Sequence, residues 1–171
     1  MKNHKTISLK RCLFPCGEMI LGSFEGKLCL CNYVDSQKRT PTDFRLQRIL
    51  KALYVESDSD VIEIARHQLN EYFMHKRREF DIPLLFVGTD FQKKVWNELL
   101  EIPYGTTISY GDLAKRIGMP NAVRAVANAN AVNAISIIAP CHRVIGSSGS
   151  LTGYGGGLER KRFLLELETH V

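Results

Sequence analysis

The chain has 171 residues, of which 44% are hydrophobic and 24% charged, and it carries a formal net charge of +5. This composition is typical of a globular protein with a buried core, and no apolar run approaches the ~20 residues of a membrane span. The positive charge permits a nucleic-acid partner without requiring one, because residues 85–171 hold nine Lys and Arg against seven Asp and Glu.

The start of the chain predicts a strand followed by a hairpin. The strand is expected over residues 7–13, and the turn Glu25-Gly26-Lys27 joins two further strands at 19–24 and 28–33. The first five residues lack the apolar core of a secretory signal, so we expect a cytoplasmic protein.

Two helices are expected next. The first runs from about residue 42 to residue 53, after a polar loop. The second follows Asp60, where residues of one face recur at steps of three and four, namely Val61, Ile64, Ala65, Gln68, Leu69, Tyr72 and Phe73. Residues 81–89 are typical of a linker, so we divide the chain into a mixed α/β domain at 1–84 and a second domain at 85–171.

The second domain is predicted to be mainly helical. Thr89 or Asp90 caps a helix over residues 91–101, which Pro103 closes. A last helix is expected over residues 157–168, with Leu158, Phe163, Leu164 and Leu167 facing inward.

Between these helices the chain predicts a helix-turn-helix. Ser109 and Asp112 form a capping box that begins a short helix, which Gly118 ends. Asn121 is expected to cap the following helix over residues 122–131. Two short helices joined by a tight turn with a glycine are typical of this DNA-binding motif.

Small side chains fill the second helix of the pair, and Arg124 is its one long cation. A helix of small residues lies close to a duplex, and an arginine at its N-terminal end reaches into a groove or a vacated base position. The same alanines suit a tightly packed helix with Arg124 as a solvated charge, so the composition alone leaves both interpretations open.

Pro140-Cys141-His142-Arg143-Val144 follows an apolar run at 135–139 that we expect to be buried. A thiol beside an imidazole has the makings of an activated nucleophile, because the thiolate is the reacting form. Other residues are ambiguous when taken singly. Tyr110 is typical of a core aromatic, Glu168 of a surface acid and Asn133 of a turn.

Several segments match one known family in combination and spacing. They are Phe91-Gln92-x-x-Val95-Trp96, Ile102-Pro103-Tyr104-Gly105, Ser109-Tyr110-Gly111-x-Leu113-Ala114, Arg124-Ala125-Val126, Asn133, Pro140-Cys141-His142-Arg143-Val144-Ile145-Gly146 and Gly153-Tyr154-x-Gly156-Gly157. Over residues 91–168 the chain therefore resembles the methylated-DNA–protein-cysteine methyltransferases, the 6-O-alkylguanine-DNA alkyltransferases. The resemblance implies an α+β fold, with a ribonuclease-H-like N-terminal domain and a C-terminal domain that carries a winged-helix-like helix-turn-helix.

The resemblance also implies direct DNA repair. Cys141 would take the alkyl group from 6-O-alkylguanine irreversibly, one group per protein molecule, with 4-O-methylthymine left open as a second substrate. His142 would accept the thiol proton through a water, and Glu168 would stabilise the imidazolium. Tyr110 would donate a hydrogen bond to the leaving guanine, and Asn133 would hold the turn before the nucleophile.

The implied partner is double-stranded DNA carrying the damaged base, bound by a monomer without a cofactor or catalytic metal. Arg124 would fill the space left by the flipped base, with Tyr110 and the small residues Ala125, Ala127, Asn128 and Ala129 also at the DNA. The base pocket would be lined by Asn130, Val144, Ser147, Tyr154 and Gly155.

The chain departs from the family pattern at two positions. Ala134 follows Asn133 where the family often has proline, and Ala139 is smaller than the usual branched residue. Neither change removes a reacting group, so we expect activity to survive.

Four of the five cysteines lie in the first domain, at Cys12, Cys16, Cys29 and Cys31. Their spacing suggests no disulfide framework, and free buried thiols are favoured over a structural zinc.

Two other classes of function remain open: a non-catalytic binder of damaged DNA with the same fold, and a helix-turn-helix regulator. A papain-like hydrolase is disfavoured because its Cys and His are distant in sequence.

Overall fold

The computed structural model describes residues 4–169 and consists of two compact units, Met1–Gly88 and Thr89–Val171. The boundary between them falls inside the segment expected to be a linker. None of the helices within residues 4–169 combines the length and apolar character that crossing a membrane would need.

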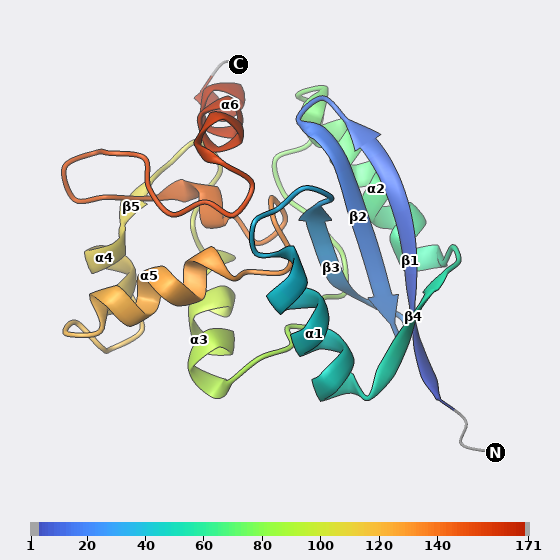
Figure 1. Ribbon diagram of the computed structural model, residues 1–171. Helices are drawn as coiled ribbons and strands as arrows, with labels where there is room; N and C mark the ends of the chain where they lie inside the picture. The colour runs from blue at the N-terminus through green and yellow to red at the C-terminus, as the bar shows by residue number, and fades with distance from the viewer. Residues whose placement is uncertain (1–3, 170–171) are drawn as a thin grey trace. The chain divides into compact units, whose positions relative to one another are not determined.

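The first unit is a four-stranded sheet with two helices (Figure 1). The strand order is β3-β2-β1-β4, in which β1 pairs antiparallel with β2 and parallel with β4. This meander with an added parallel strand fits the ribonuclease-H-like arrangement expected for the domain. The elements are β1 (Lys5–Phe14), β2 (Gly17–Phe24), β3 (Lys27–Tyr33), α1 (Arg39–Leu50), β4 (Ala52–Glu56) and α2 (Asp60–Phe73).

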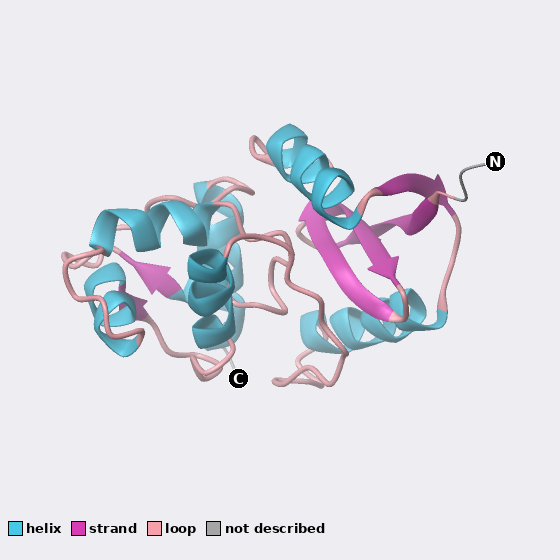
Figure 2. Ribbon diagram, turned by 90° about the horizontal axis from the view of Figure 1, so that it is seen from below, coloured by secondary structure: helices cyan, strands magenta, loops and turns pink. Residues whose placement is uncertain are grey.

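The two helices lie on opposite faces of this sheet, as Figure 2 shows. The side chains of β2 and β3 are buried at consecutive positions, so both faces of the sheet are covered there. The expected hairpin is confirmed, and Glu25 and Gly26 both have positive φ, as a tight two-residue turn between twisted strands requires.

Two expectations for the first unit need correction. The first helix begins at Arg39 and ends at Leu50, because Lys51 adopts a left-handed conformation that stops it. The residues that follow form β4, an edge strand that the helical interpretation missed. On α2, Ile62 is buried and Ile64 is 44% exposed, so the inward face is rotated slightly from the expected one.

The second unit is mainly helical. Its elements are α3 (Asp90–Leu99), β5 (Ile108–Ser109), α4 (Tyr110–Arg116), α5 (Val123–Ala131), the 3-10 helix η1 (Cys141–Arg143), β6 (Val144–Ile145) and α6 (Leu158–Thr169). The short strands β5 and β6 pair in parallel, and α5 packs against both α3 and α4 (Figure 1). The indole N–H of Trp96 on α3 donates to the Ala129 carbonyl on α5 at 2.8 Å.

The helix-turn-helix is formed as expected, with its start and stop signals largely confirmed. Thr89 and Ser109 each form a complete capping box. After α4, the N–H groups of Gly118 and Met119 bond back to Lys115 and Ala114, which closes the helix in a Schellman arrangement. The cap expected at Asn121 is wrong, because α5 begins after Ala122 and has no side-chain cap.

The inward face of α6 differs from the expected apolar one. Leu158 and Phe163 are 47% and 38% exposed, whereas Lys161, Leu164 and Glu168 are buried. Two charged side chains are tolerated inside because each has hydrogen-bonding partners there, described below.

Candidate active site

Cys141 lies at the start of η1, directly before β6. The parallel pairing of β6 with β5 brings this segment close to the start of α4, where Tyr110 follows Ser109. Cys141 is only 3% exposed, and the apolar run before it is buried as expected. The fold therefore holds the thiol in a preformed buried site.

The Asn133 side chain holds the segment that leads to Cys141. Its amide nitrogen donates to the carbonyls of Ile135 and Ala139 at 3.2 and 2.9 Å, and its oxygen accepts from the Ile135 N–H at 3.0 Å. Within this segment Ile137 is buried with φ of 71°, a conformation that a β-branched residue rarely adopts. Asn133 thus supports a strained turn just ahead of Cys141.

Replacing Asn133 with alanine should lower the free energy of unfolding of this unit by about 2–4 kcal/mol, since each buried backbone group left without a partner costs ~1–3 kcal/mol. Urea unfolding measures the change. The exposed Asn121→Ala is the matched control and should stay within about 0.5 kcal/mol of the unsubstituted protein. A loss no larger than the control would contradict the supporting role of Asn133.

His142 and Glu168 form a buried pair with Arg143. The imidazole Nε2 lies 2.7 Å from Glu168 Oε1, and Arg143 donates to both carboxylate oxygens at 2.8–3.2 Å. Arg143 also donates to the Ile102 carbonyl at 2.7 Å. Burial alone would raise the pKa of Glu168, but hydrogen bonds from His142 and Arg143 hold it at about 2. Glu168 is therefore an anion at neutral pH.

This pairing fixes the tautomer of His142. Because the ionised Glu168 can only accept, Nε2 of His142 must carry the proton. The other ring nitrogen, Nδ1, is then a lone-pair acceptor, and no group within residues 4–169 donates to it although it is fully buried. Burial lowers the pKa of His142, so the ring rests in its neutral form with a free basic nitrogen.

The Cys141 thiol rests protonated, because burial raises its pKa. Three features lower the pKa of Cys141 and so oppose the effect of burial. They are the Asn133 side chain, the charge of Lys161 and nearby backbone N–H groups. A thiolate in this site thus depends on a base to take the proton and on positive charge to stabilise what remains.

Tyr110 occupies the first turn of α4 and is 8% exposed. Its hydroxyl donates to the Thr152 carbonyl at 2.8 Å, and a Cβ at Gly153 would come within 3.0 Å of the same hydroxyl oxygen. Burial raises the pKa of Tyr110, so the hydroxyl keeps its proton and remains a donor at neutral pH.

The helix α5 exposes Arg124, Ala125 and Asn128 on one side, and Ala127 is half-buried. Within the described residues no carboxylate pairs with Arg124. Ala129 is only 3% exposed, because it packs toward α3 where its carbonyl binds Trp96, so it does not share the exposed face expected for it.

Comparison with known proteins agrees with this geometry. Residues 90–170 match the family model described as the DNA-binding domain of 6-O-methylguanine DNA methyltransferase. A methylated-DNA–protein-cysteine methyltransferase of Methanosarcina acetivorans is 46% identical over 154 residues, covering 90% of this chain and 93% of the relative. The chain belongs to the methylated-DNA–protein-cysteine methyltransferase family.

Other members extend the likeness to structure. An enzyme of the same name from Mycobacterium tuberculosis is 63% identical over 101 residues, a match that spans 59% of this chain and 61% of that relative. The crystal structure of Mycobacterium tuberculosis OGT in complex with DNA has a TM-score of 0.81 at 44% identity and covers 95% of this chain and 92% of that one. The crystal structure of the O6-methylguanine-DNA methyltransferase from Pyrococcus kodakaraensis has a TM-score of 0.62 at 26% identity. The match covers 95% of this chain and 99% of that one.

The residues that the family resemblance assigns to a base pocket differ in how deeply they are buried. Asn130 and Val144 are buried beside Cys141, and the Asn130 amide donates to the Cys141 carbonyl at 3.3 Å. Tyr154 is 9% exposed, Gly155 is half-buried and Ser147 lies exposed in the loop after β6. Asn130 Oδ1 is buried, and none of the described residues donates to it.

Two buried residues of this family member have no role that the sequence alone assigns. In the sequence, Arg143 is noticeable only because it follows the Cys-His pair, and Lys161 belongs to no motif. The spacing of Lys161, Leu164 and Glu168 at steps of three and four is the available signal, because it puts both charges on one face of α6 with a buried leucine.

Within residues 4–169, no three His, Cys, Asp or Glu side chains gather closely enough to hold a metal ion, and no disulfide joins any of the five cysteines. Cys12 and Cys29 are buried, and burial raises the pKa of both thiols, to about 12 for Cys29.

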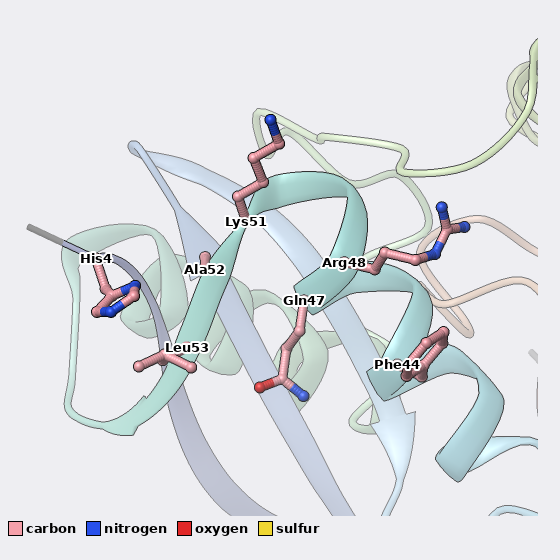
Figure 3. A pocket seen from close by; sticks show the side chains of 7 residues that line it. All are labelled: His4, Phe44, Gln47, Arg48, Lys51, Ala52 and Leu53. Carbon is pink, nitrogen blue, oxygen red and sulfur yellow. The ribbon is translucent and has the colours of Figure 1, made fainter. Parts of the chain in front are cut away.

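A pocket in the first unit contains none of the expected site residues. Figure 3 shows its side chains coming from α1, the start of β4 and the residue ahead of β1. It has no cysteine, so it offers no thiol that could accept an alkyl group. Its lining consists of His4, Phe44, Gln47, Arg48, Lys51, Ala52 and Leu53.

Proposed function

We propose that this protein repairs DNA by moving the alkyl group of 6-O-alkylguanine onto its own Cys141. The observation that carries this proposal is the buried His142, the residue that follows Cys141 in the chain, whose Nε2 is bound by Glu168 and whose Nδ1 is a base without a partner among residues 4–169. The family membership of the chain supports the same chemistry.

The proposed reaction is a displacement at the alkyl carbon. His142 Nδ1 accepts the Cys141 proton through a bridging water, and Glu168 stabilises the imidazolium that forms. The thiolate sulfur then bonds to the carbon while the bond from that carbon to guanine O6 breaks. The electron pair stays with the guanine, and the proton released from Cys141 balances its charge.

Tyr110 is proposed to donate its hydrogen bond to the departing guanine. In the resting protein that hydroxyl is bound to Thr152, so the incoming base must take the place of the Thr152 carbonyl. The exposed position of Thr152 in the loop before α6 is compatible with such a displacement. Asn130, Val144, Tyr154 and Gly155 would contact the base, whereas Ser147 would have to move inward to do so.

The base must leave the duplex to reach a thiol that is buried, which costs a few kcal/mol. We assign the filling of the vacated space to Arg124, since it is an exposed cation on α5 among small side chains. Ala125, Ala127 and Asn128 would lie against the DNA. The minor groove suits this approach, because it carries little base information and the protein must scan every sequence.

The proposed product is a thioether, which water does not hydrolyse, so each molecule acts once. No cofactor is needed because the damaged DNA supplies the alkyl group. Such a monomeric protein would work in the cytoplasm, where thiols stay reduced. The alkyl groups accepted, and whether 4-O-methylthymine is repaired, are separate questions for the same assay.

The test is an intact-mass measurement after incubation with a duplex oligonucleotide that carries one 6-O-methylguanine. We expect the mass of one methyl group to be gained by the protein and not by Cys141→Ala. An unchanged mass with tight, damage-specific binding would select the non-catalytic damage binder instead. Unchanged mass with preference for one undamaged sequence would select a regulator.

Replacing Arg124 with alanine should slow methyl transfer from duplex DNA about tenfold or more, because the side chain no longer offsets part of the cost of flipping. Transfer from free 6-O-methylguanine base should change much less. Arg162→Ala, an exposed cation on α6, is the matched control and should leave both rates unchanged. Equal losses on duplex and free base in R124A would reject the flipping role.

A further inference from the structure

Among residues 89–169, the second unit buries one more positive charge than its carboxylates balance. Its buried charged side chains are Arg143, Lys161 and Glu168. Arg143 is paired with Glu168, and His142 rests neutral on the same carboxylate. Among residues 4–169 no carboxylate lies within ion-pair distance of Lys161. A buried cation without an anion is costly unless its surroundings compensate it.

The Lys161 ammonium is instead held by neutral groups. It is 0% exposed and donates to the carbonyl of Val144 at 2.6 Å and to that of Thr152 at 2.7 Å. It also lies 5.7 Å from the centre of the Tyr110 ring. These partners are dipoles and an aromatic face, and they solvate the ammonium without neutralising it. They also fix its position against β6, the strand that directly follows the nucleophile segment.

Two groups near Lys161 can become anions, Tyr110 and Cys141, and Cys141 is the one that loses its proton in the proposed reaction. Val144, whose carbonyl accepts from Lys161, also donates its N–H to the Cys141 carbonyl. Burial lowers the pKa of Lys161 to about 8, although interaction with the charge of the Cys141 sulfur raises it. In return, the charge of Lys161 lowers the pKa of Cys141. The other charged or titratable groups around it are Tyr110 on α4, His142 and Arg143 on η1, and Glu168 on α6 itself, whose charge is already matched by Arg143.

We propose that Lys161 is a positioning residue that supplies the positive charge against which the Cys141 thiolate forms. His142 removes the proton, and Lys161 stabilises the sulfur anion that remains until it bonds to the alkyl carbon. The inference rests on Cys141 being the nucleophile of the proposed function. It adds a requirement that the Cys-His-Glu arrangement does not contain, namely a fixed cation on the side of the sulfur.

A purely structural role for Lys161 is the competing explanation, since its two hydrogen bonds tie the loop at Thr152 to β6. Substitutions of Lys161 that keep or remove its positive charge distinguish the two roles. Arginine keeps the cation, glutamine keeps an NH₂ donor group without charge, and methionine keeps only the length of the chain. A structural role requires a side chain that keeps the hydrogen bonds and the packing of Lys161, whereas the proposed role requires only its positive charge.

The test is the titration of Cys141 in the intact, DNA-free protein, followed by the ¹³C chemical shift of its β-carbon in cysteine-labelled protein. The resonance is assigned by its loss in Cys141→Ala. Lys161→Met and Lys161→Gln should each raise the pKa of Cys141 by about one unit or more, the lower end of what an opposite charge produces. Lys161→Arg should leave it close to that of the unsubstituted protein. Lys115→Met, an exposed cation on α4, is the matched control and should cause no shift.

The rate of methyl transfer provides a second readout. At neutral pH the two uncharged variants should be about tenfold slower for each unit by which the pKa rises, and their rates should recover toward alkaline pH. If Lys161→Met fails to fold, Lys161→Gln alone decides the question. A Cys141 pKa that is unchanged in the uncharged variants, or raised equally in Lys161→Arg, would overturn the proposal. Failure of the unsubstituted protein to take up a methyl group would instead reject the proposed function, and the titration would still report on the charge.

Discussion

Replacing Glu168 with glutamine is expected to lower the free energy of unfolding of the C-terminal unit by about 3–5 kcal/mol, the usual cost of breaking a buried ion pair. The carboxylate accepts from His142 and from two nitrogens of Arg143, and it is 4% exposed. The amide would leave the Arg143 charge buried without an anion. Methyl transfer should slow as well, because His142 loses the partner that fixes its tautomer. Chemical unfolding followed by circular dichroism measures the stability.

The pH dependence of this effect provides its control. In the folded protein the pKa of Glu168 is about 2, against an ordinary 4.5, so its stabilising contribution is complete above about pH 4.5. It is lost as the pH falls through 2, and the stability difference between the unsubstituted protein and E168Q should narrow over that range. Glu166→Gln, on the exposed side of α6, should differ from the unsubstituted protein by no more than about 0.5 kcal/mol. A gap between E168Q and the unsubstituted protein that stays constant down to pH 2 would reject the buried pairing.

Replacing His142 with glutamine should slow methyl transfer by about 10²–10⁴-fold, the range that one general base contributes. The amide of the introduced glutamine can still donate to Glu168, so the fold and the Arg143 pairing should persist. It has no basic nitrogen, however, and the buried Cys141 thiol would keep its proton at neutral pH. Single-turnover transfer from a methylated oligonucleotide, with quenched samples analysed by mass spectrometry, gives the rate.

The pH profile distinguishes loss of the base from general damage. The rate of H142Q should rise continuously toward alkaline pH, because hydroxide replaces the missing base. His67→Gln, an exposed histidine of α2, is the matched control and should keep both the rate and the profile. An undiminished rate in H142Q would show that Cys141 loses its proton by another route.

Local rules were sufficient to predict the elements that frame the site. The capping boxes at Thr89 and Ser109 and the glycine at Gly118 fix helix ends through contacts within a few residues. The period of α2 and the hairpin turn at Gly26 are local in the same sense. These features are encoded by neighbouring residues, so a single sequence reveals them.

Features that depend on distant partners were missed. The strand β4 is stabilised by its pairing with β1, where Lys5 lies opposite Ala52, whereas its residues alone suggest the end of a helix. Lys161 and Glu168 face inward on α6 because carbonyls and an arginine from elsewhere in the unit receive them. The expected apolar face, with Leu158 and Phe163, followed the ordinary preference for burying hydrophobic side chains. Buried charge breaks that preference, and here it is carried by Arg143, Lys161 and Glu168.

The site residues themselves were predicted from the family resemblance rather than from physical pattern. Taken singly, Tyr110, Asn133 and Glu168 have ordinary structural explanations as a core aromatic, a turn residue and a surface acid. The structure buries all three, so the surface position expected for Glu168 is wrong. What distinguishes them is where their polar atoms point, toward Thr152, the strained turn and His142 respectively. Sequence spacing carries no information about such directions until the fold brings the segments together.

The most direct test of the account is to locate the transferred methyl group among the five cysteines. The protein is incubated with a duplex that carries 6-O-(¹³C-methyl)guanine, digested, and mapped by tandem mass spectrometry. We expect label on Cys141 alone, and Cys12, Cys16, Cys29 and Cys31 serve as internal controls. Label on any of those four, or no label while the duplex is bound, would contradict it.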